Sequence, residues 1–230
     1  MTRRNEHGQP VGDPVPDWTA RERPRPTTLE GRFVRLEPLD ARNAEELLAR
    51  LARHPALWTY LGDEPPTDVP QAAVRMAEAA RERGEVVFVV VRSSDDSVHG
   101  TCRLMRTDET NGVTEVGAIA YTPELQRTPA TTEATYLLAR HVFDDLGYRR
   151  LEWKLDSLNE PSAAAARRLG FTEEGTFRNA LVYKGRNRDT RWFSIIDVEW
   201  PAIRHRLDAW LHPDNFGSDG RQHRSLRELA

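Results

Sequence analysis

The stretch that decides the fold is residues 116–171, VGAIAYTPELQRTPATTEATYLLARHVFDDLGYRRLEWKLDSLNEPSAAAARRLGF. Its hydrophobic pattern predicts a strand, a polar loop, a helix over 131–146, a second strand over 149–156 and an alanine-rich helix over 161–169. A glycine follows each helix, as is common at helix ends. A helix that joins two neighbouring strands of one sheet makes a right-handed crossover and leaves the strands parallel. The stretch therefore predicts a parallel strand pair inside an α/β domain.

Outside this stretch, the chain predicts strands and helices that complete a mostly antiparallel sheet. Alternating and continuous apolar runs predict strands at 31–39, 86–92, 98–106, 113–122, 176–184 and 190–200. Helical spacing predicts helices at 41–53, 70–83 and 201–211. The loop at 107–112 ends in Asn-Gly, a strong hairpin signal, so the strands that flank it pair antiparallel. The predicted fold class is α/β, with a mixed, mostly antiparallel sheet of about seven strands flanked by helices.

The chain divides into three parts. Residues 1–27 are rich in Pro, Arg, Asp and Gly and lack periodicity, which predicts an extended N-terminal arm. Val15 and Trp18 are apolar enough to dock this arm on the body, and a free tail is the alternative. Residues 28–212 hold the predicted elements and form one domain. Residues 213–230 predict a polar C-terminal tail.

Composition excludes several classes of protein. The 230 residues carry 33 basic and 36 acidic side chains, a net charge of -3, so the global basic field of a nucleic-acid binder is missing. Cys102 is the single cysteine, which excludes an intramolecular disulfide and a cysteine-rich zinc site. No apolar run approaches the roughly 20 residues of a membrane span, and the N-terminus lacks the apolar segment of a signal peptide. We expect a cytoplasmic protein without a membrane or nucleic-acid partner and without a metal.

Two helix starts within 116–171 carry polar groups. The loop at 126–134, QRTPATTEA, precedes a helix whose first N–H groups have no intrahelical partner and whose dipole is positive there. Such a place accepts a pyrophosphate, although an ordinary helix cap has the same residues. Asn159 and Ser162 follow the strand at 149–156, at the sheet edge where α/β proteins bind ligands. Taken alone, these two residues are better explained by plain capping.

The combination of both helix starts resembles a known family. The segment NEPSAAAARRLGFTEEGTFR at 159–178 is similar to the motif N-x-x-S-x-x-x-x-x-x-L-G-F-x-x-E-G-x-x-R of the GNAT superfamily of acyl-CoA N-acyltransferases. The upstream EVGAIAYTPELQRTPATTEA at 115–134 resembles the branch of ribosomal-protein alanine N-acetyltransferases, the Rim type. The similarity extends over roughly 29–200 and includes the order of elements.

The resemblance implies a GNAT-like sheet that is splayed in the middle, between the strands at 113–122 and 149–156. It implies acetyl-CoA, or another acyl-CoA, as co-substrate. The pantetheine arm would lie in the splay and the pyrophosphate at the loop of 126–131. The residues implied to bind the cofactor are Ala118, Ile119, Ala120, Tyr121, Gln126, Arg127, Thr128, Ala130, Thr131, Asn159 and Ser162.

Two departures from the family pattern bear on function. Pro129 stands where the family has a phosphate-loop glycine, and proline has no N–H to give to a phosphate. Thr131 replaces a small residue two positions later, and Arg127 with the threonine hydroxyls could compensate. Leu181 stands where relatives carry a carboxylate on the acceptor side.

The implied reaction is direct transfer of the acyl group to a primary amine in a ternary complex. Glu115 is a candidate base through water, and Ser162 is a candidate acid for the leaving thiolate. The acceptor would be a small-molecule amine or a protein N-terminus, and a homodimer is open. Candidate acceptor-binding residues are Trp58, Tyr60, Arg178, Tyr183 and Trp192, with core packing as the alternative for the aromatic ones. A non-catalytic acyl-CoA-binding module and a transferase for a larger or anionic acyl-CoA such as succinyl-CoA are the competing hypotheses.

Overall fold

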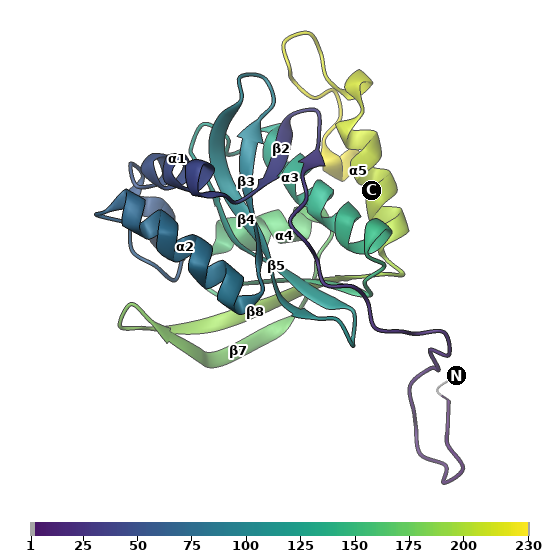
Figure 1. Cartoon of the computed structure of the whole chain (residues 1–230). Helices are drawn as coiled ribbons and strands as arrows, with labels where there is room; N and C mark the ends of the chain where they lie inside the picture. The colour runs from purple at the N-terminus through teal and green to yellow at the C-terminus, as the bar shows by residue number, and fades with distance from the viewer. Residues whose placement is uncertain (1–2, 230) are drawn as a thin grey trace.

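The computed structural model describes residues 3–229 and is built on a single eight-stranded sheet in the order β1-β2-β3-β4-β5-β6-β8-β7 (Figure 1). Only β5 and β6 pair in parallel; all other neighbours are antiparallel. The strands are Leu29–Glu30, Val34–Pro38, Val86–Arg92, Ser97–Asp108, Val113–Tyr121, Arg150–Asp156, Thr172–Tyr183 and Arg186–Ile196, numbered β1 to β8. The mixed, mostly antiparallel sheet confirms the predicted fold class. The additional strand is β1, which is too short to show an alternating pattern.

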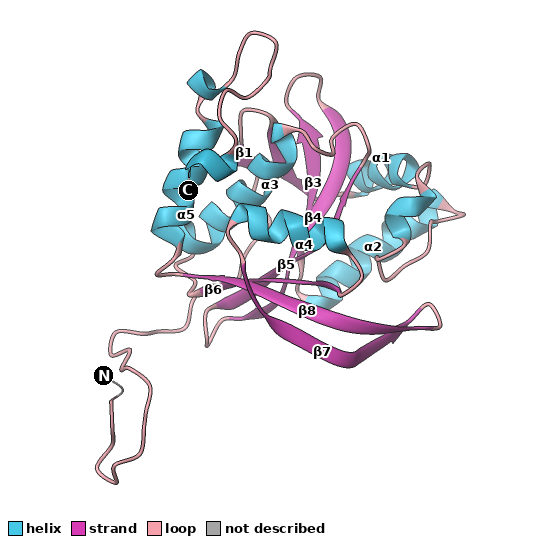
Figure 2. Ribbon diagram, turned by 180° about the vertical axis from the view of Figure 1, so that it is seen from behind, coloured by secondary structure: helices cyan, strands magenta, loops and turns pink. Residues whose placement is uncertain are grey.

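Helices cover the sheet on both faces (Figures 1 and 2). Helices α1, Ala41–Leu51, and α2, Val69–Arg83, lie on one face, where Leu47 and Leu51 pack in a cluster with Val89 and Val91 of β3. Helices α3, Pro129–Arg140, α4, Glu160–Leu169, and α5, Trp200–Leu211, lie on the other face over the main apolar core. Strands β7 and β8 extend beyond the helices as a long hairpin.

The parallel pair separates partway along its length. Strands β5 and β6 pair only from Val113 opposite Arg150 to Glu115 opposite Glu152. Ala118 then has a φ of 48°, and the register of β5 on β4 gains one residue at this point. This bulge turns the end of β5 away from β6 and leaves its β6-facing edge without a partner strand. The structure thus contains the splay that the resemblance implied.

The helix that follows the splay is shorter than predicted. Helix α3 ends at Arg140 and continues as a single π-helical turn, His141–Asp145, before Gly147 at a φ of 65°. The turn places Val142 and Phe143 in the core. Hydrophobic spacing does not distinguish an α turn from a π turn, so the difference was not readable in the sequence.

The two terminal segments both contact the domain. Trp18 of the arm donates from its indole N–H to the carbonyl of Thr110, 2.8 Å away, in the β4–β5 hairpin. That hairpin lies at the end of β5 opposite the splay. The prediction of a polar tail needs correction, since Leu226 is buried and Phe216 packs edge-on against Trp210 of α5. These two apolar residues are isolated among polar ones, so neither the tail's spacing nor its composition indicated packing.

Candidate active site

The start of α3 is open for an anion. Thr128 is its N-cap, but the Thr128 hydroxyl donates backward to the carbonyl of Leu125, 2.7 Å away, and makes no cap. In contrast, α1, α2 and α4 are each capped by an Asp or Asn side chain. Pro129 occupies the first helical position, where proline is favoured and its missing N–H is one of the unpaired ones anyway. The N–H groups of Ala130 and Thr131 are therefore free of intrahelical partners.

The loop before α3 is braced against the splayed strand. Gln126 donates from its side-chain amide to the carbonyl of Tyr121, 2.9 Å away. Arg127 is exposed and has a φ of 60°, which directs the chain sharply into the helix. Burial raises the pKa of the Tyr121 phenol, whose ring packs against the main core, so only the backbone of this residue borders the splay. The loop before α3 and the unpaired end of β5 thus lie next to one another.

The second helix start lies across the splay, at the end of β6. The Asn159 side-chain oxygen accepts from the N–H of Ser162, 3.2 Å away, so Asn159 caps α4. The Ser162 hydroxyl accepts from the indole N–H of Trp153, 3.0 Å away. This bond leaves the hydroxyl proton of Ser162 to be donated elsewhere. Trp153 is a positioning residue that sequence reasoning missed, because its partner is nine residues away on another element.

Glu115 lies on the face of the sheet opposite to Trp153 and Ser162, where it belongs to a group of charged side chains. Its carboxylate is 2.7 Å from Arg106 and 3.0 Å from the ammonium of Lys154, and 3% of the residue is exposed. Lys154 also pairs with Glu152 at 2.8 Å and lies 3.8 Å above the ring of Trp192. The candidate base is therefore held between two cations, and Trp192 forms part of the floor beneath Lys154.

Asp156 is a carboxylate at the splay that the sequence analysis did not single out. It ends β6, is 5% exposed, and has no ion-pair partner within residues 3–229. Its carboxylate accepts from the Tyr183 hydroxyl at 2.7 Å and from the N–H of Leu158 at 2.9 Å. Burial and the bond to Asp156 raise the pKa of Tyr183 to about 12, so the phenol remains a donor at neutral pH. A carboxylate at the carboxyl end of a parallel strand was the available signal.

The position of Asp156 relative to the splay follows from the strand registers. Glu115 lies opposite Glu152, and β5 gains one residue at its bulge before Ala120. Counting from that pair places Ala120 and Asp156 at the same level on the two sides of the opening. A ligand held between Ala120 and Asp156 would meet the Asp156 carboxylate on its side toward α1 and α2. Ser162, bonded to Trp153 in the main core, lies toward the other face.

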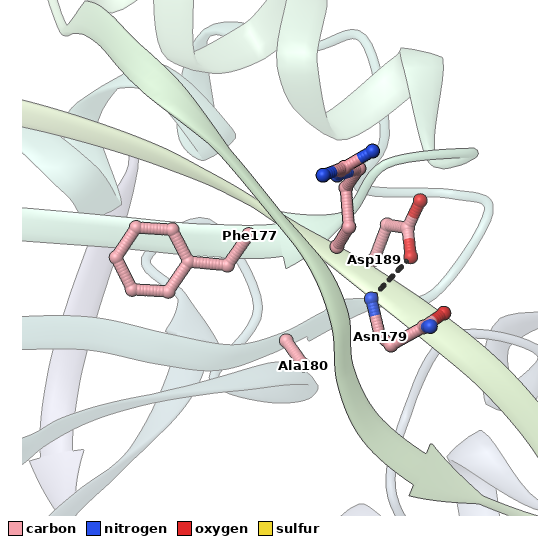
Figure 3. A pocket seen from close by; sticks show the side chains of 5 residues that line it. Phe177, Asn179, Ala180 and Asp189 are labelled. Carbon is pink, nitrogen blue, oxygen red and sulfur yellow. Dashed lines mark hydrogen bonds between the residues drawn. The ribbon is translucent and has the colours of Figure 1, made fainter.

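The residues that the sequence suggested for binding the acceptor lie in different places, and only some of them are near the splay. Tyr60 donates to the carbonyl of Leu158, 3.2 Å away, which brings the segment after α1 to the end of β6. Trp58 is buried in the α1–α2 cluster and its indole N–H bonds to Leu51, so the side chain packs there. Arg178 lines a shallow hollow at a bulge in β7 together with Asp189 (Figure 3).

The hollow is lined by residues on both sides of the β7–β8 ribbon, Phe177, Arg178, Asn179, Ala180 and Asp189. In Figure 3, Phe177 lies on one side of the β7–β8 ribbon and Asp189 and Asn179 on the other. Phe177 stacks on Trp192 with ring centroids 4.8 Å apart, on the face that carries Asp156. The N–H of Asn179 and the charge of Arg178 hold the pKa of Asp189 below its usual range. Arg178 thus lies beside Asp189 at this hollow.

Residues 3–229 contain neither a metal-type cluster nor a membrane-spanning helix. No three His, Cys, Asp or Glu side chains gather there into a group that could hold a metal ion. None of the helices in that range combines the length and the apolar character needed to cross a membrane.

Comparisons with known proteins agree with this geometry. Residues 34–172 match the family described as acetyltransferase (GNAT) domain. A crystal structure of a GCN5-related N-acetyltransferase from Brucella melitensis is 42% identical, covers 94% of this chain and 99% of its own, and superimposes with a TM-score of 0.86. The uncharacterized N-acetyltransferase p20 of Bacillus licheniformis is 28% identical over 75% of this chain and 98% of its own.

A third relative bears on the branch within the family. YdaF of Bacillus subtilis strain 168, whose name assigns it provisionally to the ribosomal N-acetyltransferases, is 25% identical over 72% of this chain and 90% of its own length. The family match covers more than half of the chain, from β2 to the start of β7, and includes both helix starts and the splay. The chain therefore belongs to the GNAT family of acetyltransferases.

Proposed function

We propose that the protein transfers an acetyl group from acetyl-CoA to a primary amine, directly and within a ternary complex. The observation that carries the proposal is the splay between β5 and β6, which has a donor-side group, Ser162, and an acceptor-side carboxylate, Asp156, at its edge. An amine that enters on the face of α1 and α2 would attack the thioester carbonyl, and the thiolate would leave toward α4.

The donor side supports binding of a phosphate-bearing cofactor. The uncapped start of α3 offers N–H groups and a positive dipole to a pyrophosphate, and Arg127 adds a mobile cation. The unpartnered edge of β5 at Ala118 to Tyr121 offers backbone groups to the amides of a pantetheine arm. Pro129 at the first helical position removes an N–H without disturbing the two that follow it.

The proton from the attacking amine needs an acceptor. We assign this role to Asp156, because it is buried at the level of the opening and is not paired with a cation among the described residues. The original candidate, Glu115, is held by Arg106 and Lys154, which favours a role in fixing the sheet face. A positioned base or acid typically contributes about 10²–10⁴-fold to the rate.

The remaining steps use groups on β5 and α4. The carbonyl oxygen becomes an oxyanion in the tetrahedral intermediate, and backbone N–H groups near Ala120 on the open edge would stabilise it. The Ser162 hydroxyl, oriented by Trp153, would donate its proton to the departing sulfur. Holding both reactants in one opening supplies much of the acceleration by itself.

Calorimetric titration with acetyl-CoA, followed by measurement of thiol release with a panel of primary amines, tests the proposal. We expect saturable binding and amine-dependent release of CoA, with mass detection of the acetylated product. Cys102 does not interfere with a thiol reagent, since its burial raises its pKa to about 12. Binding without release on any amine would instead support the acyl-CoA-binding module, and no binding at millimolar acetyl-CoA would refute the enzyme.

A further inference from the structure

Arg188 on β8 is a cation without an assigned partner near the splay. Within residues 3–229 it makes no ion pair and no hydrogen bond, although its Nε atom is buried. The residue directly opposite it on β7 is Leu181, which cannot pair with a charge. Its guanidinium lies 5.8 Å from the centre of the Tyr183 ring, the same ring whose hydroxyl reaches Asp156.

Other cations of this hairpin are already engaged. Lys184 donates to the carbonyl of Trp58 at 2.6 Å, and Arg186 donates to the carbonyl of Thr59 at 2.9 Å. Arg191 pairs with Glu160 at 2.8 Å. These contacts fasten the hairpin to the segment after α1 and to α4, whereas Arg188 adds nothing to that attachment.

The same face of β8 carries two more unsatisfied groups. Thr190 and Trp192 follow Arg188 at intervals of two residues, so all three side chains project from one face. The Thr190 hydroxyl and the Trp192 indole N–H are buried without a partner among the described residues. Buried polar groups are normally hydrogen-bonded, so a row of three unpaired donors indicates a ligand.

Asp156 supplies the opposite charge in the same place. It lies directly across from Thr190, and Arg188 is two residues further along β8, a diagonal neighbour at about 7–8 Å. Among residues 3–229 the two side chains form no ion pair with one another, so a molecule that carries both charges can bind to them. Tyr183 forms the wall between them.

We propose that the acceptor is a small amine that carries a carboxylate close to its amino group, as an α-amino acid does. Arg188 binds the carboxylate, and Asp156 binds the ammonium and takes one of its protons to give the neutral amine. The second proton, released as the C–N bond forms and the C–S bond breaks, passes through the Ser162 hydroxyl to the departing sulfur. The proposal rests on the transfer reaction proposed above and specifies its substrate class. A peptide N-terminus has a neutral amide at the position of this carboxylate, so the site favours a free amino acid over a protein N-terminus.

Binding can be measured without any transfer. The protein is saturated with CoA, and L-amino acids are titrated by calorimetry in parallel with their α-carboxamides. We expect at least one acid to bind about tenfold or more tightly than its amide, as charge-assisted hydrogen bonds allow. Equal affinity for every acid and its amide, or no binding of any acid, would overturn the proposal.

Two variants test whether Arg188 is the group that binds the carboxylate of the acceptor. Arg188→Gln removes the cation, and Leu181→Glu places a carboxylate directly opposite Arg188 to occupy it. We expect both to abolish the preference for acids and to leave the affinity for amides and for acetyl-CoA unchanged. Arg75→Gln, an exposed position on α2, is the matched control and should keep the full preference. A preference that survives in both test variants contradicts the assignment.

The carboxylate could instead belong to the acyl group. A carboxylate of the acceptor and a carboxylate of the acyl group can be distinguished by thiol release. The rates with acetyl-CoA and with succinyl-CoA are compared on an amine that carries no carboxylate. We expect Arg188→Gln to lower use of the amino acid with acetyl-CoA and to leave the succinyl-to-acetyl ratio unchanged. A selective loss of succinyl transfer would overturn the acceptor assignment. Amino-acid binding is measured on protein that is already saturated with CoA. A loss of amino-acid binding there therefore reports on the acceptor site and not on the binding of acetyl-CoA.

Discussion

At the residue scale, the two polar residues at the start of α4 have separate tasks. The side-chain oxygen of Asn159 accepts the hydrogen bond that caps the helix. The Ser162 hydroxyl accepts a hydrogen bond from Trp153, so its own proton is still available for donation. Capping and chemistry were alternatives for the pair when read from sequence. In the folded protein Asn159 makes the cap, and the catalytic role is proposed for Ser162 alone.

The acid role of Ser162 is tested with a pair of variants. Ser162→Ala should lower kcat by about 10²-fold, at the low end for loss of a general acid, with little change in acetyl-CoA affinity. Trp153→Phe keeps the ring but loses the N–H, and should lower kcat by less than Ser162→Ala. Steady-state rates and calorimetry measure both quantities. A kcat for Ser162→Ala equal to that of the wild type ends the proposal.

The base is tested by comparing two isosteric amide substitutions. Asp156→Asn should reduce kcat/KM by about 10²–10⁴-fold, because the amide cannot accept the amine proton. Glu115→Gln should reduce it less than tenfold but lower the free energy of unfolding by about 1–3 kcal/mol, since Lys154 and Arg106 lose a buried partner. Rates and urea unfolding are both needed. The reverse pattern of rates would return the role to Glu115.

At the element scale, the start of α3 shows how context changes the meaning of a residue. Pro129 stands where the family pattern has glycine, and its lack of an N–H suggested weaker phosphate binding. The structure puts it at the first helical position, where its restricted φ suits the helix and no intrahelical bond is lost. The helix boundary, which spacing could not locate within two residues, shows that the proline costs the helix no hydrogen bond, although a phosphate would still lack that N–H.

Replacing this proline by glycine tests the interpretation. Pro129→Gly should lower the free energy of unfolding by about 0.4–1 kcal/mol, because the unfolded chain gains freedom. The Kd for acetyl-CoA should stay within about threefold, since a hydrogen bond gained is offset by a looser loop. Denaturant unfolding and calorimetry provide the two numbers. A tenfold gain in affinity would show that the missing N–H does limit phosphate binding.

At the scale of the whole molecule, the N-terminal arm stabilises the domain at a distance from the site. Trp18 lies in contact with two arginines, 4.4 Å from Arg21 and 5.3 Å from Arg149, and bonds to the β4–β5 hairpin. The Tyr148 hydroxyl donates to the carbonyl of Glu22 at 2.9 Å. These contacts lie at the end of β5 away from Tyr121, so residues 18–22 of the arm lie away from the splay.

Removal of the Trp18 side chain should therefore affect stability and not binding. Trp18→Ala should lower the free energy of unfolding by about 1–3 kcal/mol, from lost packing and cation–π contact. Val11→Ala, on an exposed part of the arm, should change it by less than 0.5 kcal/mol, as a surface control. Thermal unfolding and acetyl-CoA titration measure the two effects. A raised Kd for acetyl-CoA in Trp18→Ala would contradict the separation.

Much of the fold was readable in the sequence, because its signals are local. The apolar run of β3, the Asp caps of α1 and α2, and Gly84 and Gly170 at helix ends each depend on neighbouring residues. Local chemistry also located both helix starts on the donor side. Local signals did not predict the π-helical turn after α3 or the packing of Leu226, because both depend on residues distant in the sequence.

The sequence by itself determined the fold class and the membership of the GNAT family, because these follow from hydrophobic spacing and short motifs. Only the tertiary structure decided which charges are free. Glu115 is paired with Lys154 of β6, whereas Asp156 and Arg188 lie on either side of Tyr183 without an ion-pair partner among the described residues. Charge pairing depends on which strands are neighbours, and strand order is not written in the spacing of any single element.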